Sequence, residues 1–298
     1  MTDNSPSTRG ERGSRTRRVL HALWRARTHV FLILVTLATL YPLMLVIRIA
    51  LTPGQAYDGS PSPIPDEVTF ANFAAVLGET DAQGDWLFGP QLFNSIIISL
   101  ATTVVGVFLA TTAAYAFSRA RFAGQRVGLM AFLVSQMFPG VLMMIPLYLI
   151  MQELHLLDNP LGLILAYSTT AIPFCVWMLK GYFDTIPREL EESAIMDGAG
   201  QFTIFWRIIL PLSLPAVAVT ALFSFMTAWN EFVLAYTFMD NPKSFTLPVA
   251  VNTYVGAKSI QWGKFAAASV LVSLPVMALF FRLQKHLVGG LMAGSVKG

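Results

Sequence analysis

Long runs of apolar residues alternate with short polar segments along this chain. A helix that crosses a bilayer needs about 20 predominantly apolar residues, and six runs are of that order. They cover residues 30–51, 92–117, 127–152, 161–179, 214–239 and 265–281. The pattern predicts an all-α polytopic membrane protein with six transmembrane helices, and the 298 residues leave room for the connections.

The composition excludes an ordinary soluble protein. Hydrophobic residues make up 55% of the chain and charged residues 12%, with a mean hydropathy of +0.60. Soluble domains carry about 25% charged residues. The single cysteine, Cys175, lies inside an apolar run, so no disulfide framework exists.

The hydropathy pattern divides the chain into five parts. Residues 1–27 are rich in Arg, Ser, Gly and Thr, and we expect them to be a disordered basic cytoplasmic segment. Residues 28–51 form the first span, and 52–91 an extracytoplasmic loop without Lys or Arg. Residues 92–288 hold five further spans and a polar loop at 184–213, and 289–298 form a cytoplasmic tail.

The amino-terminal arginines have two other interpretations, which the sequence disfavours. Arg17-Arg18 resembles a twin-arginine export signal, but the following run is long enough to span and no A-x-A cleavage site follows it. A basic patch can also bind nucleic acid. Directly before a membrane span it is more typical of a cytoplasmic flank, so we expect an uncleaved anchor and no nucleic-acid partner.

The distribution of Lys and Arg predicts the orientation. Sixteen of the 20 Lys and Arg residues fall in the termini and in the second and fourth connections, which all lie on one side. The opposite side has only four: Arg48, Lys243, Lys258 and Lys264. Because basic residues are enriched in cytoplasmic segments, we expect a multi-pass cell (inner) membrane protein with both termini cytoplasmic.

Helix breakers and polar residues inside two spans indicate a candidate translocation path. Pro and Gly free backbone groups that are tolerated only beside protein or a water-filled cavity. An acid inside the membrane is a functional candidate by default, although Glu231 could instead be a neutralised carboxylate that packs or gates. The path residues so predicted are Gln136, Pro139, Gly140, Asn230 and Glu231.

The polar loop 184–213 has the signals of a helix–Gly–helix hairpin. Pro187 suits the first turn of a helix that Asp184 or Thr185 could cap, and Asp197-Gly198 provides a stop. A second short helix should follow, with an apolar stripe at i, i+3, i+4 and i+7 lying on a surface. The stripe consists of Phe202, Phe205, Trp206 and Ile209. Three acids should face water: Glu189, Glu191 and Glu192.

The spacing inside this loop resembles the cytoplasmic coupling loop of permease subunits of ATP-binding-cassette (ABC) importers. The pattern is Glu-Ser-Ala, three residues and Gly198, then nine residues and Ile-Ile-Leu-Pro211. One position departs, because Ser193 stands where the family usually has Ala. The resemblance implies coupling to a separate ATPase, with Glu192 contacting a basic residue there. The coupling residues it implies are Glu192, Ser193, Ala194, Asp197, Gly198, Ala199, Ile208, Leu210 and Pro211.

Other motifs extend the resemblance to residues 28–298. Segments 113–119 (AAYAFSR), 186–190 (IPREL), 229–232 (WNEF) and 290–298 (GLMAGSVKG) are similar to carbohydrate-importer permeases. The tail is most similar to that of the smaller permease subunit of maltose/maltodextrin importers. The resemblance implies a type I ABC importer permease fold and import of maltose/maltodextrin or a related oligosaccharide. Trehalose and glycerol phosphate derivatives are alternatives.

The same resemblance implies an assembly in the membrane lipid. Its other members would be a second homologous permease subunit, two ABC ATPase subunits and an extracytoplasmic sugar-binding protein that delivers the sugar substrate. The outer loop near residues 247–262 would contact the binding protein. The tail would insert between the ATPase subunits.

The chain lacks the motifs of two other function classes. No G-x-x-x-x-G-K-[ST] loop occurs, so ATP hydrolysis is expected on a separate subunit, and no cofactor is expected. The four histidines are dispersed, so no metal site is expected. A membrane-embedded enzyme would need a nucleophile–base or metal constellation, which we do not find. An ion-coupled carrier usually has paired broken helices, and only the third span is clearly interrupted.

Overall fold

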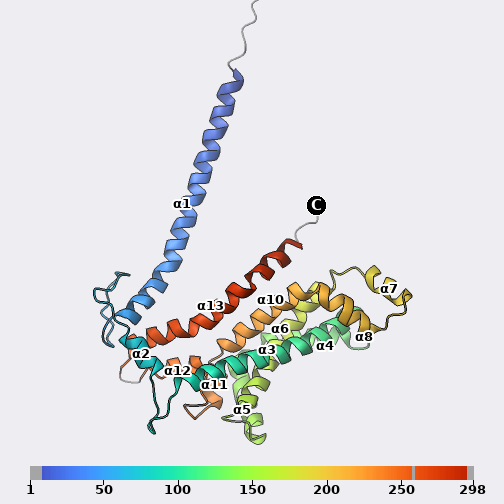
Figure 1. The fold of residues 1–298 in the computed structure, drawn as a ribbon. Helices are drawn as coiled ribbons and strands as arrows, with labels where there is room; N and C mark the ends of the chain where they lie inside the picture. The colour runs from blue at the N-terminus through green and yellow to red at the C-terminus, as the bar shows by residue number, and fades with distance from the viewer. Residues whose placement is uncertain (1–8, 257–258, 294–298) are drawn as a thin grey trace, which may run out of the picture.

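The computed structural model describes residues 9–256 and 259–293, and the chain is helical through most of these ranges. Within them the only β-structure consists of two isolated bridges, Thr80 with Trp86 and Val255 with Ile260. Residues 1–8 and 294–298 of the predicted terminal segments lie outside the described part. Figure 1 shows an elongated bundle with short helices at both ends.

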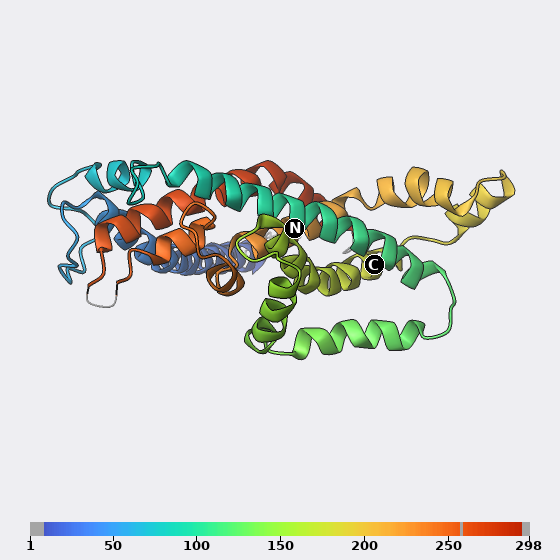
Figure 2. The ribbon, with the colours of Figure 1, turned by 90° about the horizontal axis from the view of Figure 1, so that it is seen from below.

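Three long helices form the body: α3 (Phe88–Arg119), α6 (Pro160–Phe183) and α10 (Leu214–Trp229). They lie side by side in both views (Figures 1 and 2). A Cβ on Gly106 would come within 3.7 Å of the Ser224 hydroxyl and 3.9 Å of the Ala171 methyl group. Small residues of this kind let membrane helices approach closely, so α3 packs against both neighbours.

Two more long helices meet at one end of the body and diverge from there (Figure 1). They are α1 (Arg9–Leu51) and α13 (Trp262–Ala293), and they pack beside α2 (Ala71–Leu77) and α12 (Leu247–Asn252). The span-forming part of α1, Trp24–Leu51, has no buried residue in its most apolar window. Residues 24–44 of this helix are therefore exposed, and only its last two turns pack against the rest of the chain.

The start of α1 differs from the sequence expectation. Residues 9–27 were expected to be disordered, but the helix is continuous from Arg9. Arg, Ala and Leu are strong helix formers, and no proline occurs between position 6 and Pro42. The apolar span that follows can therefore extend its helix into the basic segment.

The third predicted span is broken, as the sequence predicts. α4 (Gln125–Met137) and α5 (Gly140–Glu153) make an angle of 102° across Phe138 and Pro139. Pro139 has an extended ψ of 123°, which stops the helix before it. In Figure 2 the two helices form a corner beside the body.

The fifth predicted span is also interrupted, and here the single helix expected over 214–239 is wrong. α10 ends at Trp229, and α11 (Val233–Phe238) starts after three residues. A second bend of 76° separates 201–212 from α10. Among the described residues, four helices are long and apolar enough to cross a membrane, and six spans result when each bent pair counts as one.

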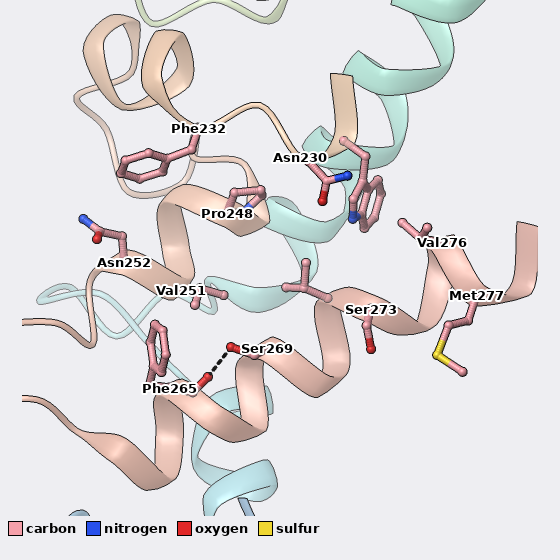
Figure 3. Close-up of a pocket in the computed structure, with 12 residues that line it drawn as sticks. Asn230, Phe232, Pro248, Val251, Asn252, Phe265, Ser269, Ser273, Val276 and Met277 are labelled. Carbon is pink, nitrogen blue, oxygen red and sulfur yellow. Dashed lines mark hydrogen bonds between the residues drawn. The ribbon is translucent and has the colours of Figure 1, made fainter. Parts of the chain in front are cut away.

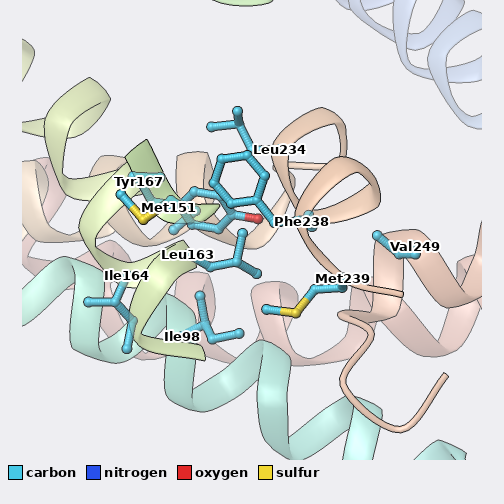
Figure 4. Packing of buried hydrophobic residues seen from close by; sticks show 12 residues of the cluster. Ile98, Met151, Leu163, Ile164, Tyr167, Leu234, Phe238, Met239 and Val249 are labelled. Atoms are coloured by element: carbon cyan, nitrogen blue, oxygen red, sulfur yellow. The ribbon is translucent and has the colours of Figure 1, made fainter. Parts of the chain in front are cut away.

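The largest buried cluster lies where α3, α5, α6 and α11 meet (Figure 4). Ile98 of α3, Leu163 and Tyr167 of α6, and Phe238 of α11 are all almost fully buried there. A second cluster around Cys175, Leu179 and Phe183 fills the opposite end. The two cores fix both ends of α6 against α3.

Ion pairs anchor the acidic segment 52–91 to the rest of the chain. Arg48 of α1 forms a two-pronged pair with Asp58, at 3.0 and 2.5 Å. Lys264 of α13 pairs with Glu79 at 3.1 Å, and Lys243 pairs with Asp81 and Asp85. Acidic residues of this segment, which contains no Lys or Arg, therefore form ion pairs with basic residues from other parts of the chain. The Arg48 pair holds the pKa of Asp58 below its ordinary value, chiefly through the hydrogen bond.

Candidate functional site

A protruding hairpin (residues 184–213) lies at the end of the body farthest from α2 and α12 (Figures 1 and 2). Its first helix is α7 (Glu189–Met196), and Gly198 follows with φ +83°. The Gly198 N–H donates to the Ile195 carbonyl and the Ala199 N–H to the Ala194 carbonyl, both at 2.9 Å. These two bonds are a Schellman cap, which needs a left-handed residue at Gly198. The predicted stop is confirmed.

The start of α7 differs from the prediction, because neither Asp184 nor Thr185 caps it. Asp184 instead ends α6 and accepts hydrogen bonds of 2.6 Å from Ser118 and from Lys180. Burial alone would raise the pKa of Asp184. The hydrogen bonds from Lys180 and Ser118 and the charges of Lys180 and Arg119 outweigh it and hold the pKa below its ordinary value.

An ion pair between Arg119, the last residue of α3, and Glu191 of α7 joins the hairpin to the body. Their side chains are 10% and 13% exposed, so the expectation that Glu191 faces water is wrong. Arg119 also donates to the Ser118 hydroxyl at 2.9 Å and to the Ile186 carbonyl at 3.0 Å. Sequence reasoning quoted Arg119 within a motif but gave it no role, because its partner lies 72 positions away.

The second helix of the hairpin contains a π turn and buries only part of the predicted apolar stripe. It runs through α8 (Gln201–Ile204), η1 (Phe205–Ile209) and α9 (Leu210–Leu212), and the Leu210 N–H bonds the Phe205 carbonyl. Phe205 and Ile209 are buried, but Phe202 is 77% exposed and Trp206 42% exposed. The predicted single apolar stripe is therefore only half correct, because the helix buries Phe205 and Ile209 but leaves Phe202 and Trp206 exposed.

The hairpin exposes most of the residues that the sequence singles out. Glu192, Ser193, Asp197, Gly198 and Pro211 are exposed, and Ala194, Ala199, Ile208 and Leu210 are partly buried. Large apolar side chains are exposed beside them, and sequence reasoning assigned these no role except for Phe202. They are Leu190 at 44%, Ile195 at 57%, Met196 at 88% and Phe202 at 77%. Apolar area left open on a polar protrusion is typical of a protein-binding surface.

A cavity of about 580 Å³ brings together three of the five predicted path residues. Gln136 from the end of α4, Gly140 from the start of α5 and Glu231 line it together with Thr169 and Thr170 of α6. The Gln136 amide donates to the Thr170 carbonyl at 3.0 Å. Pro139 lies at the break between the two helices. The broken span therefore borders a cavity, as its prolines and glycine indicate.

The carboxylate of Glu231 serves as the cap of α11. It accepts hydrogen bonds from the Leu234 N–H at 2.9 Å and the Ala235 N–H at 3.2 Å. An acidic cap satisfies free N–H groups and favours the positive end of the helix. The carboxylate thus stabilises the interruption of the fifth span while one side of it borders the cavity.

Asn230 lies on the other side of the same interruption. It lines a groove of about 510 Å³ between α10, α12 and α13, together with Phe232, Asn252 and Ser273 (Figure 3). Its amide nitrogen donates to the Met226 carbonyl at 2.8 Å. Its amide oxygen is not used in this bond and can accept a hydrogen bond. The structure therefore separates Asn230 from Glu231, although the two are adjacent in sequence.

In the described ranges no three His, Cys, Asp or Glu side chains are grouped so that they could hold a metal ion.

Comparison with known proteins decides the family. Residues 102–292 match the family described as "Binding-protein-dependent transport system inner membrane component". The chain belongs to this family. The matched part of this transport permease begins inside α3 and ends in α13, so it contains the hairpin and both cavities.

Relatives of this permease match over most of its length. It is 38% identical to a maltose/maltodextrin transport system permease protein, MalG, of Yersinia pestis, covering 91% of the chain and 93% of that protein. It is 35% identical to a maltodextrin transport system permease protein, MalD, of Streptococcus pneumoniae, covering 93% and 96%. The sequence resemblance is thereby confirmed.

A solved structure confirms the fold of the permease. A chain of a bacterial ABC transporter involved in the import of the acidic polysaccharide alginate superposes with a TM-score of 0.74. The two chains share 23% identity, and the match covers 95% of this chain and 99% of the other. The predicted all-α, polytopic fold of a type I ABC importer permease is therefore correct.

Proposed function

We propose that this permease is a transmembrane subunit of an ATP-driven importer of a carbohydrate, maltose/maltodextrin or a related oligosaccharide. It would work with a second homologous permease, two ABC ATPase subunits and an extracytoplasmic sugar-binding protein. Its maltose and maltodextrin relatives, 35–38% identical, support the sugar. The observation that carries the proposal is the protruding hairpin with its exposed apolar side chains.

The hairpin is suited to dock on a moving ATPase. α7 ends in a complete Schellman cap, and the Arg119–Glu191 pair fixes its first turns. Glu192 is exposed beside Ile195 and Met196, so a partner could bury the apolar side chains and pair a basic residue with the carboxylate. ATP hydrolysis then takes place on the partner, and this chain is not itself an enzyme.

The charge distribution supports an orientation with the hairpin in the cytoplasm. The hairpin and the region around it carry Lys180, Arg188 and Arg207, whereas the acidic segment 52–91 lies at the opposite end. The positive-inside rule then assigns both termini to the cytoplasm. The tail, 289–298, would lie on the ATPase side.

The two cavities beside the interrupted fifth span supply a path for a sugar. Glu231, Gln136 and Thr170 offer polar groups in one cavity, and Asn230, Asn252 and Ser273 in the other. Aromatic rings with amides and hydroxyls form the kind of surface that binds sugar hydroxyls and ring faces. The burial of residues within the outer loop, 247–262, limits which of them a binding protein could contact. Leu247, Val249 and Ala250 are buried, whereas Thr253, Val255 and Gly256 are exposed, so a binding protein would contact the second half of this loop.

Purification of the tagged permease from its host membrane tests the proposal. An ABC ATPase and a second permease should co-purify in stoichiometric amounts. Reconstituted vesicles should hydrolyse ATP faster when a sugar-loaded binding protein is added, and should accumulate that sugar. Transport of sugar by the purified chain alone, without an ATPase, would contradict the proposal.

A further inference from the structure

Helix α7 has little to hold it in place except polar contacts. It has no buried residue, and its apolar attachment is through the partly buried Ala194, with Ala199 just beyond the helix. In both views it lies at the tip of the protrusion (Figures 1 and 2). A helix without a buried face cannot transmit a displacement through packing alone. A displacement of α7 must therefore be transmitted through the polar contacts of its first turn.

Those contacts converge on the end of α3. All three nitrogens of the Arg119 guanidinium donate: to Glu191 of α7, to the Ile186 carbonyl and to the Ser118 hydroxyl. Arg188 also donates to the Ser118 carbonyl at 3.3 Å. Of the ion pairs among described residues, this is the one in which both side chains are nearly buried. Only arginine has donors in this fork geometry, so lysine cannot replace it contact for contact.

The opposite end of α3 holds the outer loop that leads to α12. The Gln91 amide donates to the Pro242 carbonyl at 3.0 Å and the Asn94 amide to the Lys243 carbonyl at 2.8 Å. The Ser95 hydroxyl accepts from the Leu247 N–H at 2.6 Å. A helix of 32 residues is about 48 Å long. A single unbroken element thus connects the tip of the hairpin to the outer loop.

We propose that α3 is a coupling rod and that Arg119 is its positioning residue. When an ATPase displaces α7, the Arg119 contacts oblige α3 to move with it. The hydrogen bonds of Gln91, Asn94 and Ser95 then carry the displacement to residues 242–247, beside the groove that contains Asn230. This inference rests on the proposed function, because it requires an ATPase on the hairpin.

The test uses the complete importer reconstituted in vesicles, with a cysteine reporter at the outer loop. Asp240 is exposed and makes no side-chain hydrogen bond among the described residues, and the native Cys175 is buried. The labelling rate of Asp240→Cys with an impermeant maleimide is measured before and after trapping the ATPase with ATP and vanadate. With Arg119 intact, trapping should change this rate by about fivefold or more, the lower end of typical allosteric couplings.

In the Arg119→Gln variant the labelling change should disappear while the ATPase stays bound to the permease. Reversing the pair, with Arg119→Glu and Glu191→Arg together, should restore part of the change. Arg126→Gln is the matched control, because Arg126 is exposed on α4 and should leave the response intact.

Two results would overturn the rod. One is a normal labelling change in Arg119→Gln. The other is loss of the ATPase from both Arg119→Gln and the reversed pair, because Arg119 would then only shape the docking surface. Failure of the proposed function itself looks different. No ATPase would bind to the protein with Arg119 intact.

Discussion

Substitution of Gly198 by valine should disconnect the two helices of the hairpin. Gly198 has φ +83°, and a Cβ built there has no atom within 4 Å. The substitution therefore causes no steric clash, and its cost is confined to the backbone. A left-handed conformation costs an L-residue about 1–2 kcal/mol, and a β-branched residue is the least tolerant of it.

The chain can relieve this strain only by giving up the cap. That would break the hydrogen bonds from Gly198 to Ile195 and from Ala199 to Ala194, and neutral bonds contribute about 0.5–1.5 kcal/mol each. In either case the free energy of the structured hairpin rises by about 1–2 kcal/mol relative to its unstructured state. Because 1.4 kcal/mol corresponds to a factor of ten, ATPase affinity should fall by up to about tenfold as the fraction of protein with a structured hairpin falls.

The assay measures how much ATPase remains on the tagged permease in detergent as the ATPase is diluted. Gly200→Val is the matched control, because Gly200 also faces open space but has φ −77° and ψ 162°, which any residue adopts. Gly198→Asn should lie between the two, since asparagine tolerates the left-handed region. Equal retention in Gly198→Val and in the parent protein, or equal losses at both glycines, would refute the reasoning.

Three further predictions concern charge and orientation. Cysteine at Asp66 should react with an impermeant maleimide from outside the cell and cysteine at Lys297 should not; the reverse pattern would contradict the orientation. Glu192→Lys should keep the hairpin but reduce ATPase retention and sugar uptake, and normal values of both would show that the carboxylate is not at the interface. The pKa of Asp58 is lowered by Arg48, so the stability from this pair is present above the ordinary carboxyl pKa and is lost as pH falls through the folded value. The rate of protease cleavage in segment 52–91 should therefore rise only in acid, and Asp58→Asn should raise it at neutral pH. A cleavage rate that changes neither with pH nor with Asp58→Asn would show that the Arg48–Asp58 pair does not hold this segment.

The elements that sequence predicted best are those set by local chemistry. Gly198 follows an unbroken helical run and favours a stop there, and Pro139-Gly140 disfavours a continuous helix. Each of these features depends on the conformational limits of one or two residues, so a single sequence is sufficient to predict it.

The features that sequence missed depend on residues far apart in the chain. The partner of Arg119 is 72 positions away, and nothing at either site signals the other. The separation of Asn230 from Glu231 follows from the break in the helix after Trp229. The residues on both sides of this break are apolar, so the hydropathy pattern does not reveal it. The π turn at Phe205–Ile209 has no signal in a single sequence, and a pattern at a period of 3.6 does not show that the body covers only Phe205 and Ile209 of the stripe.

The measurement that tests the account most directly is site-specific cross-linking from the hairpin. Met196 is 88% exposed at the end of α7, and Asp66 lies in the segment at the opposite end of the body. With a photo-reactive group attached to cysteine at each position in turn, the group at 196 should cross-link to a co-purifying ABC ATPase and the group at 66 should not. An absence of any ATPase adduct at 196, or equal adducts at both positions, would contradict the claim that this hairpin couples the permease to ATP hydrolysis.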